Sequence, residues 1–229
     1  MEGSSNFSRG LWISTHDGGI TWQPGNAPVG GLVSAAGGEL WLVGGVQDSS
    51  LYESKDGGAT WQAASLPLTS TAEQTPALGP VYSTGRGNGV VLTATMSAAG
   101  QNNAVVTVLS GDASGSQWNW TAGPAITLGG DYGAGTPVTT SIADGVLWVL
   151  SSSQIAQVAL STGHVSVVSP DGLPQATAVA LHAQSATQAW LSYSVESCSA
   201  TKSGCATVSG LVSTADGGHL WSPAQNPIR

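Results

Sequence analysis

The chain has 229 residues, including 32 Gly and nine Trp, and only 8% of its residues are charged. Five Lys and Arg stand against thirteen Asp and Glu, which gives a net charge of −8 and argues against nucleic acid or an anionic membrane surface as a partner. The sequence has no apolar run long enough to insert into a membrane, and MEGSSNFSRG at its start lacks the pattern of a signal peptide.

Taken in chain order, short runs of Val, Leu, Ile, Thr and Trp bounded by Gly, Asn and Asp predict strands throughout. Two strand patterns at about 10–24 form a half-unit, and four full units of four strands follow at about 31–65, 79–122, 137–169 and 176–224. Four short strands repeating every 40–50 residues or so are typical of a β-propeller blade. We therefore expect an all-β protein, a single β-propeller domain over 1–229 built from four-stranded antiparallel blades.

A Gly-rich turn with an Asp recurs between the third and fourth strands of these units. It reads STHDGGITW at 14–22, SKDGGATW at 54–61 and STADGGHLW at 213–221, with a looser copy, SGDASGSQW, at 110–118. Gly supplies the backbone angles of a tight turn, Asp accepts hydrogen bonds from amides of its own turn, and Ser and Trp close the network and cover it. The residues expected in these structural roles are Ser14, Asp17, Trp22, Ser54, Asp56, Trp61, Ser110, Asp112, Trp118, Ser213, Asp216 and Trp221.

The pattern S-x-D-G-G-x-T-W resembles the Asp-box, or bacterial neuraminidase repeat. This repeat occurs in sialidases, in xyloglucan-cleaving hydrolases, in sortilin and in photosystem II assembly factors. The resemblance implies a β-propeller with the Asp turn on the hairpin between the third and fourth strands, but it does not imply one function. The arginine triad that a sialidase would require is not matched by Arg9, Arg86 and Arg229, two of which lie at the chain ends.

Propeller ligands generally bind on the side opposite these turns. There the sequence places Asp48, Asn102, Asn103, Asp131, Tyr132 and Glu196 as candidate ligand-binding residues. Asp131 and Tyr132 stand out because flexible glycines in GGDYGAG present an acid beside an aromatic ring. A polar loop between blades is the competing interpretation.

The candidate ligand-binding residues do not form a catalytic motif. We expect neither a metal nor another cofactor, and each Asp turn supplies only one carboxylate, which gives too few oxygens for a calcium site. The expected function is non-catalytic: a binding or assembly scaffold for a protein or glycan. The alternative is a glycoside hydrolase that uses two acids on the loop side.

Cys198 and Cys205 flank a short polar loop, and a disulfide between them is expected, with two free thiols as the alternative. A disulfide favours an extracytoplasmic location. The half-unit at 10–24 lacks a first and a second strand, so we expect open blade edges. Such edges indicate either a larger propeller or self-association.

Overall fold

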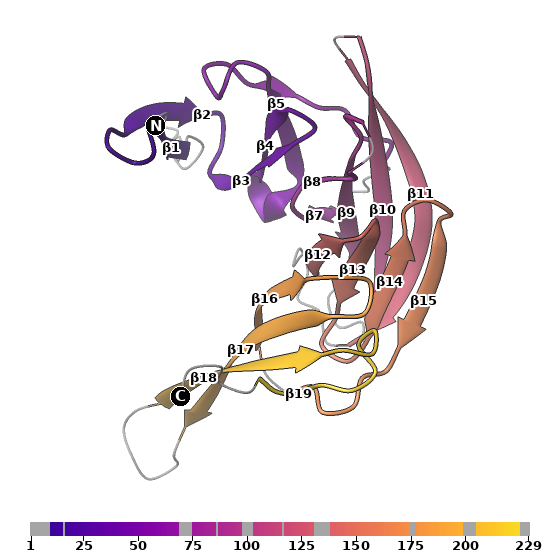
Figure 1. Ribbon diagram of the computed structural model, residues 1–229. Coiled ribbons are helices and arrows are strands. Elements are labelled where there is room, and N and C mark those ends of the chain that lie inside the picture. The colour runs from indigo at the N-terminus through magenta and orange to yellow at the C-terminus, as the bar shows by residue number, and fades with distance from the viewer. Residues whose placement is uncertain are drawn as a thin grey trace, which may run out of the picture. The chain divides into compact units, whose positions relative to one another are not determined.

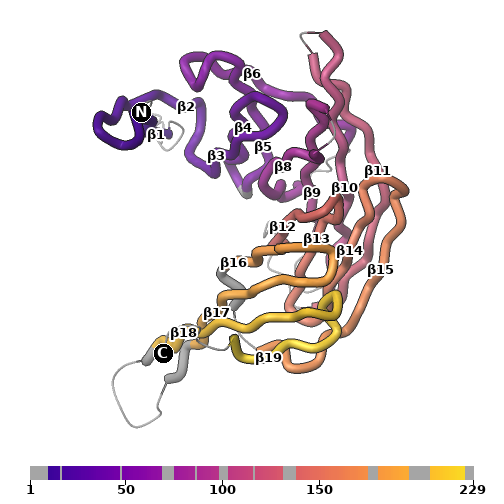
Figure 2. Tube along the Cα trace, in the orientation of Figure 1, coloured from indigo at the N-terminus to yellow at the C-terminus, as the bar shows by residue number. Residues whose placement is uncertain are grey.

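The structure is a computed structural model that describes residues 10–15, 17–68, 75–85, 87–97, 103–115, 117–130, 138–174, 177–198 and 205–224 (Figure 2). These residues are almost entirely β-structure, with one short 3-10 helix, η1 (Val46–Asp48), and no helix able to span a membrane.

The strands follow one another closely along the chain. They are β1 (Gly10–Ser14), β2 (Gln23–Ala27), β3 (Gly31–Ala36), β4 (Glu39–Gly44), β5 (Ser50–Ser54), β6 (Gln62–Ala63), β7 (Ala77–Leu78), β8 (Tyr82–Ser83), β9 (Val90–Met96), β10 (Asn103–Ser114), β11 (Gln117–Gly129), β12 (Thr139–Ala143), β13 (Val146–Leu150), β14 (Ile155–Ala159), β15 (His164–Val168), β16 (Thr177–Ala183), β17 (Ala189–Cys198), β18 (Cys205–Thr214) and β19 (Ser222–Pro223).

Consecutive strands pair with one another to form separate antiparallel sheets (Figure 1). Strands β1 and β2 form a two-stranded sheet, and three four-stranded sheets have the orders β3-β4-β5-β6, β12-β13-β14-β15 and β16-β17-β18-β19. This is the blade topology of a β-propeller, so the predicted fold class is confirmed.

The remaining sheet differs in its first strand. Here β7 and β8 both pair with β9, so two short strands take the place of one first strand in this four-strand unit. Pro80, which separates them, has no amide hydrogen to donate to the ladder, and such residues interrupt a strand. The hairpin β10–β11 is also long, with strands of 12 and 13 residues.

The chain divides into two compact units, and β10 and β11 each contribute residues to both. Unit 1 comprises Met1–Ser97, Thr107–Gly123 and Ala134–Pro137, and unit 2 comprises Ala98–Val106, Pro124–Gly133 and Val138–Arg229. Each unit has its own apolar core.

Tryptophan organises both cores. In unit 1 the fully buried Trp41 makes edge-to-face contacts with Trp118 and Trp120, at centroid distances of 5.1 and 5.5 Å. In unit 2 Trp148 and Trp221 are buried in a single cluster between the two blades. Buried aromatic rings bring a large apolar area into the core, which explains how a chain with one Phe stabilises its blades.

The two cysteines lie directly opposite each other in the backbone register of β17 and β18. Opposed residues on antiparallel strands have Cα separations within the range that a disulfide requires. The disulfide stays a prediction, and the register is compatible with it.

Candidate functional site

The Asp56 turn, which joins β5 to β6, is closed by its own side chains. Ser54 Oγ donates to Asp56 Oδ1 at 2.9 Å and accepts from the Gly58 amide at 2.7 Å. Thr60 donates twice to the carboxylate, from its amide at 2.8 Å and from its hydroxyl at 2.6 Å. The Thr60 hydroxyl is the main cause that lowers the pKa of Asp56 to about 2, so this carboxylate is ionised, and both of its oxygens accept hydrogen bonds within the turn.

The Asp17 turn, between β1 and β2, has the same network with a different hydroxyl residue. Thr15 Oγ1 donates to Asp17 Oδ1 at 2.8 Å and accepts from the Gly19 amide at 2.8 Å. Ser14, predicted for this role, is one residue too early, and alternate residues of a strand point to opposite faces. The Thr21 hydroxyl is again the main cause that lowers the pKa of Asp17, to about 2.

The Asp216 turn, between β18 and β19, needs the same correction. Thr214, not Ser213, donates to Asp216 Oδ1, at 2.8 Å, and accepts from the Gly218 amide at 3.1 Å. The backbone amide of Leu220 is the first cause that lowers the pKa of Asp216.

The tryptophan that ends each turn has a different environment in each copy. Trp22 and Trp221 donate their indole N–H to the carbonyl oxygens of Gly19 and Gly218, both at 3.1 Å. The indole N–H of Trp61 is buried without a hydrogen-bond partner. The Trp61 ring packs edge-to-face against Trp12, with 6.3 Å between the ring centroids. Sequence reasoning assigned no role to Trp12, which lies outside the repeated motif.

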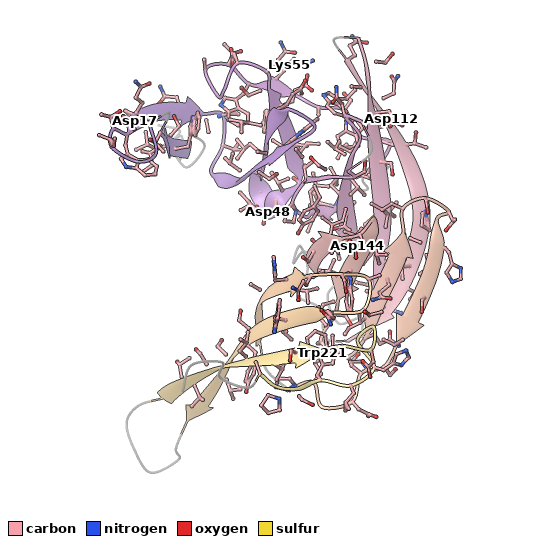
Figure 3. The ribbon with its side chains drawn as sticks, viewed as in Figure 1. Asp17, Asp48, Lys55, Asp112, Asp144 and Trp221 are labelled. Carbon is pink, nitrogen blue, oxygen red and sulfur yellow. The ribbon has the colours of Figure 1, made fainter. Side chains whose placement is uncertain are left out.

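The fourth expected turn, at 110–118, does not form. Asp112 lies within β10, and the hairpin bends only after Ser114 (Figure 3). Its sequence has Ala and Ser where the other copies have the Gly-Gly that makes the tight bend. Ser110 is likewise a strand residue, and Trp118 donates to Glu39 Oε2 at 2.8 Å instead of covering a turn.

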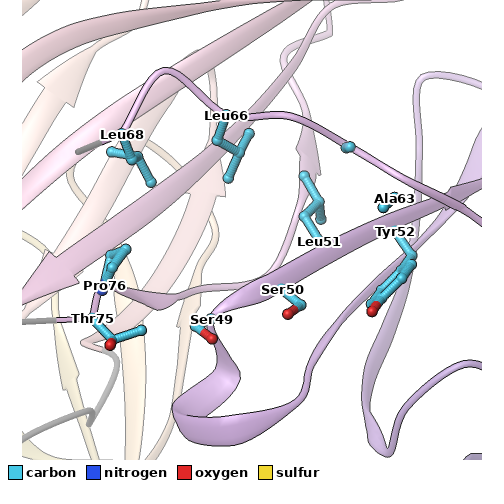
Figure 4. Close-up of a pocket in the computed structure, with 10 residues that line it drawn as sticks. Ser49, Ser50, Leu51, Tyr52, Ala63, Leu66, Leu68, Thr75 and Pro76 are labelled. Atoms are coloured by element: carbon cyan, nitrogen blue, oxygen red, sulfur yellow. The ribbon is translucent and has the colours of Figure 1, made fainter. Parts of the chain in front are cut away.

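The candidate binding site is a cavity of about 320 Å³ in unit 1, on what we call the loop side of the blade β3–β6. The loop side is the end of the blade that carries the connection from β4 to β5 and the segment after β6, opposite the Asp56 turn. Figure 4 shows Leu66 and Leu68, which follow β6, across the cavity from Ser49, Ser50 and Pro76.

The described lining of this cavity is uncharged. Its apolar surface comes from Leu51, Ala63, Ala64, Leu66, Leu68 and Pro76. Its hydrogen-bonding groups are the hydroxyls of Ser49, Ser50, Tyr52 and Thr75. A cavity of this kind suits an apolar group flanked by a few hydrogen-bonding atoms.

The candidate ligand residues from the sequence do not line this cavity where they are described. Asp48 ends η1 immediately before Ser49, in a left-handed conformation with φ of 51°. Asn103 is an exposed residue at the start of β10, and Glu196 lies in β17 opposite Thr207. Asn102, Asp131 and Tyr132 lie outside the described residues.

Among the described residues, His, Cys, Asp and Glu side chains do not form a group of three or more that could hold a metal ion. His219 is part of the Asp216 turn, where its amide donates to Asp216 Oδ1 at 3.1 Å. His182 stacks on Trp190 with the ring planes 13° apart.

Comparison with known proteins shows no matching family model and no matching curated protein. Three solved structures are similar at 16% sequence identity. "YCF48 bound to D1 peptide" has a TM-score of 0.46 over 93% of this chain and 74% of that chain. The GH43 endo-arabinanase from Bacillus licheniformis has a TM-score of 0.47 over 83% of this chain and 73% of that chain. The native Bacillus subtilis arabinanase Arb43A has a TM-score of 0.46 over 79% of this chain and 69% of that chain. A similarity at this level does not assign a function to the chain.

Proposed function

We propose that this chain is a non-catalytic Asp-box propeller that binds a segment of another protein in the loop-side cavity of the blade β3–β6. Three Asp-Gly-Gly turns with the same side-chain network support the assignment to the Asp-box repeat. The observation that carries the binding proposal is the uncharged cavity beside β5 and β6. The half-buried Leu66 and Leu68 offer a partner's apolar side chain a place to bury.

The neighbouring strand favours a polypeptide over a glycan as the occupant. In the described part of the chain, β6 pairs only with β5, so β6 is the outer strand of its sheet. Outer strands present unpaired amide and carbonyl groups to which an extended peptide can add. Hydroxyls of Ser50 and Thr75 can supply further hydrogen bonds near the cavity, and the Ser49 hydroxyl, which donates to the Val46 carbonyl at 2.8 Å, can accept one.

The alternative function, glycoside hydrolysis, requires two carboxyl groups on either side of a sugar. The described residues that line the cavity contribute none. Glu73 and Asp131, two acids that the sequence places in loops, lie outside the described residues. The enzyme interpretation therefore has no supporting observation in the described site.

Two further proposals accompany this function. The protein acts outside the cytoplasm, which the opposed positions of Cys198 and Cys205 support. The two-stranded sheet β1–β2 pairs with strands of another blade, from a larger propeller or a second copy, which the exposed side chains of Leu11 (74%) and Ile13 (59%) support.

Filling the cavity tests the proposed function. Peptides would be selected against the protein from a displayed random library, and their affinities measured by calorimetry. Ala63→Trp places a large ring in the cavity at an exposed strand position and should lower the affinity by about tenfold or more. Gln62→Trp is the matched control, because Gln62 is the exposed neighbour in β6 and does not line the cavity.

Selected peptides that bind the parent and the Gln62→Trp variant but not the Ala63→Trp variant would support the proposal. A library that yields no binding peptide, or peptides whose affinity Ala63→Trp leaves unchanged, would contradict it. Circular dichroism and thermal melts of both variants show whether they retain the fold.

A further inference from the structure

Unit 1 has a second, larger cavity of about 560 Å³, at the opposite end of the blade β3–β6 from the loop-side cavity. Four segments surround it: the end of β1, the hairpin between β3 and β4, the Asp56 turn, and Ser83 in β8. We call it the turn-side cavity.

One part of the wall is apolar. Trp12 contributes its indole ring, and Ala35, Ala36 and Leu40 contribute aliphatic surface from the β3–β4 hairpin. The position of Trp12 is set by close packing on Gly58, where an added Cβ would overlap the ring. The aromatic wall is therefore held by a contact with the Asp56 turn.

Glu39 and Lys55, which carry a carboxylate and an ammonium group, also line the cavity. The Glu39 side chain is only 19% exposed, and its Oε2 accepts the indole N–H of Trp118 at 2.8 Å. Its other oxygen, Oε1, lies 3.9 Å from Lys55 Nζ, which is longer than a hydrogen bond. Glu39 is thus fixed in orientation with one oxygen still able to accept a hydrogen bond from a ligand.

Two glycines leave room in the cavity. A Cβ added to Gly38 or to Gly57 would meet no atom within 4 Å, although both residues line the cavity. Both have positive φ, 86° and 68°, so the tight turns place bare backbone there. Backbone without side chains lets a ligand approach amide and carbonyl groups closely.

Local charge excludes acidic ligands. Among the described residues, two carboxyl groups, those of Glu39 and Glu53, lie 3.9 and 3.6 Å from the ammonium group of Lys55. An added carboxylate or sulfate would meet this acidic surplus, on a chain whose net charge is already −8.

We propose that the turn-side cavity binds a neutral saccharide. A sugar ring presents C–H groups on one face, which suit the indole of Trp12, and hydroxyls at its edge that both donate and accept hydrogen bonds. Glu39 Oε1 can accept from these hydroxyls and Lys55 can donate to them, and bonds to charged groups are the stronger kind. Apolar walls with a few fixed polar groups are the usual chemistry of small-ligand sites.

The probes are cellohexaose, xylohexaose and maltohexaose, with hexagalacturonate as the acidic comparison, titrated by calorimetry and by tryptophan fluorescence. At least one neutral hexasaccharide should bind, and hexagalacturonate should bind more weakly than it. Gly57→Asn and Gly38→Asn should each lower the affinity by about tenfold or more, because each adds a side chain to a residue that lines the cavity. Among residues that have a side chain, Asn is one of those that best tolerate positive φ, so these turns should still form.

Gly18→Asn is the matched control. Gly18 has the place in the Asp17 turn that Gly57 has in the Asp56 turn, with φ of 73° and open space around it, but it does not line the cavity. The Gly18→Asn variant should bind the neutral hexasaccharide with the same affinity as the parent protein. Lys55→Ala provides a second variant that leaves the turn backbone untouched, and it should also weaken binding.

Binding that Gly57→Asn, Gly38→Asn and Lys55→Ala reduce and Gly18→Asn does not would support the proposal. The absence of binding by all three neutral hexasaccharides, preference for hexagalacturonate, or equal affinity in all variants would overturn it. These outcomes do not depend on the loop-side cavity, which Ala63→Trp tests separately.

Discussion

Replacing Trp221 with Ala is expected to lower the free energy of unfolding by about 3–5 kcal/mol. Trp221 is 2% exposed and packs in the apolar core of unit 2, so its loss leaves a large cavity there. The variant also loses the hydrogen bond from the indole to the carbonyl of Gly218. Chemical denaturation followed by circular dichroism measures the change.

Trp22→Ala is the control for this substitution. Trp22 ends the Asp17 turn and makes the same indole bond to its own turn, but it is 56% exposed. Its removal should therefore cost about 1 kcal/mol or less. If the two variants lost equal stability, burial in the core would not be what distinguishes them, and the packing assigned to Trp221 would be wrong.

Gly58→Ala is expected to destabilise the protein by about 2–5 kcal/mol, because two costs act at one position. The backbone of Gly58 has φ of 91°, which side chains disfavour, and the added methyl group would overlap the ring of Trp12. The turn or the indole must then move. Thermal and chemical denaturation of the variant measure the loss.

Gly19→Ala separates these two costs. Gly19 is the equivalent glycine of the Asp17 turn, with φ of 92°, and the nearest atom to an added Cβ is Trp22 Cζ2 at 3.8 Å. It should lose about 1–2 kcal/mol, the backbone cost alone. Equal losses at Gly19 and Gly58 would contradict the packing of Trp12 on the Asp56 turn.

The sequence predicted the blades well because strand pairing depends on local patterns. Alternating apolar residues and Gly-containing turns recur along the chain, and within each four-stranded sheet every strand pairs with the next one in the chain. The looser copy at 110–118 shows where the pattern fails: without Gly-Gly after Asp112, the strand continues. The assignment of Ser14 and Ser213 failed because the hydroxyl must stand two residues before the Asp, where Thr15 and Thr214 stand.

The two cavities could not be predicted in the same way. The loop-side cavity combines β5 with a segment after β6 and with Pro76, and its members have no common motif. Trp12 meets Gly58 across 46 positions of sequence, a contact that depends on how the half-blade packs and not on its own strand pattern. Candidate ligand residues chosen mainly as charged or amide side chains in loops, such as Asp48, miss a site whose described lining is uncharged.

Hydrogen–deuterium exchange with a library-selected peptide tests most directly the claim that the chain binds a protein segment at its loop-side cavity. We expect the backbone amides at 49–52 and 62–68 to exchange more slowly when the peptide is added. These segments line the cavity and include the outer strand β6. Exchange at the Asp17 turn and in β14–β15, which do not line it, should stay unchanged. Unchanged exchange at 49–52 and 62–68 while the peptide is bound, with protection elsewhere, would contradict the account.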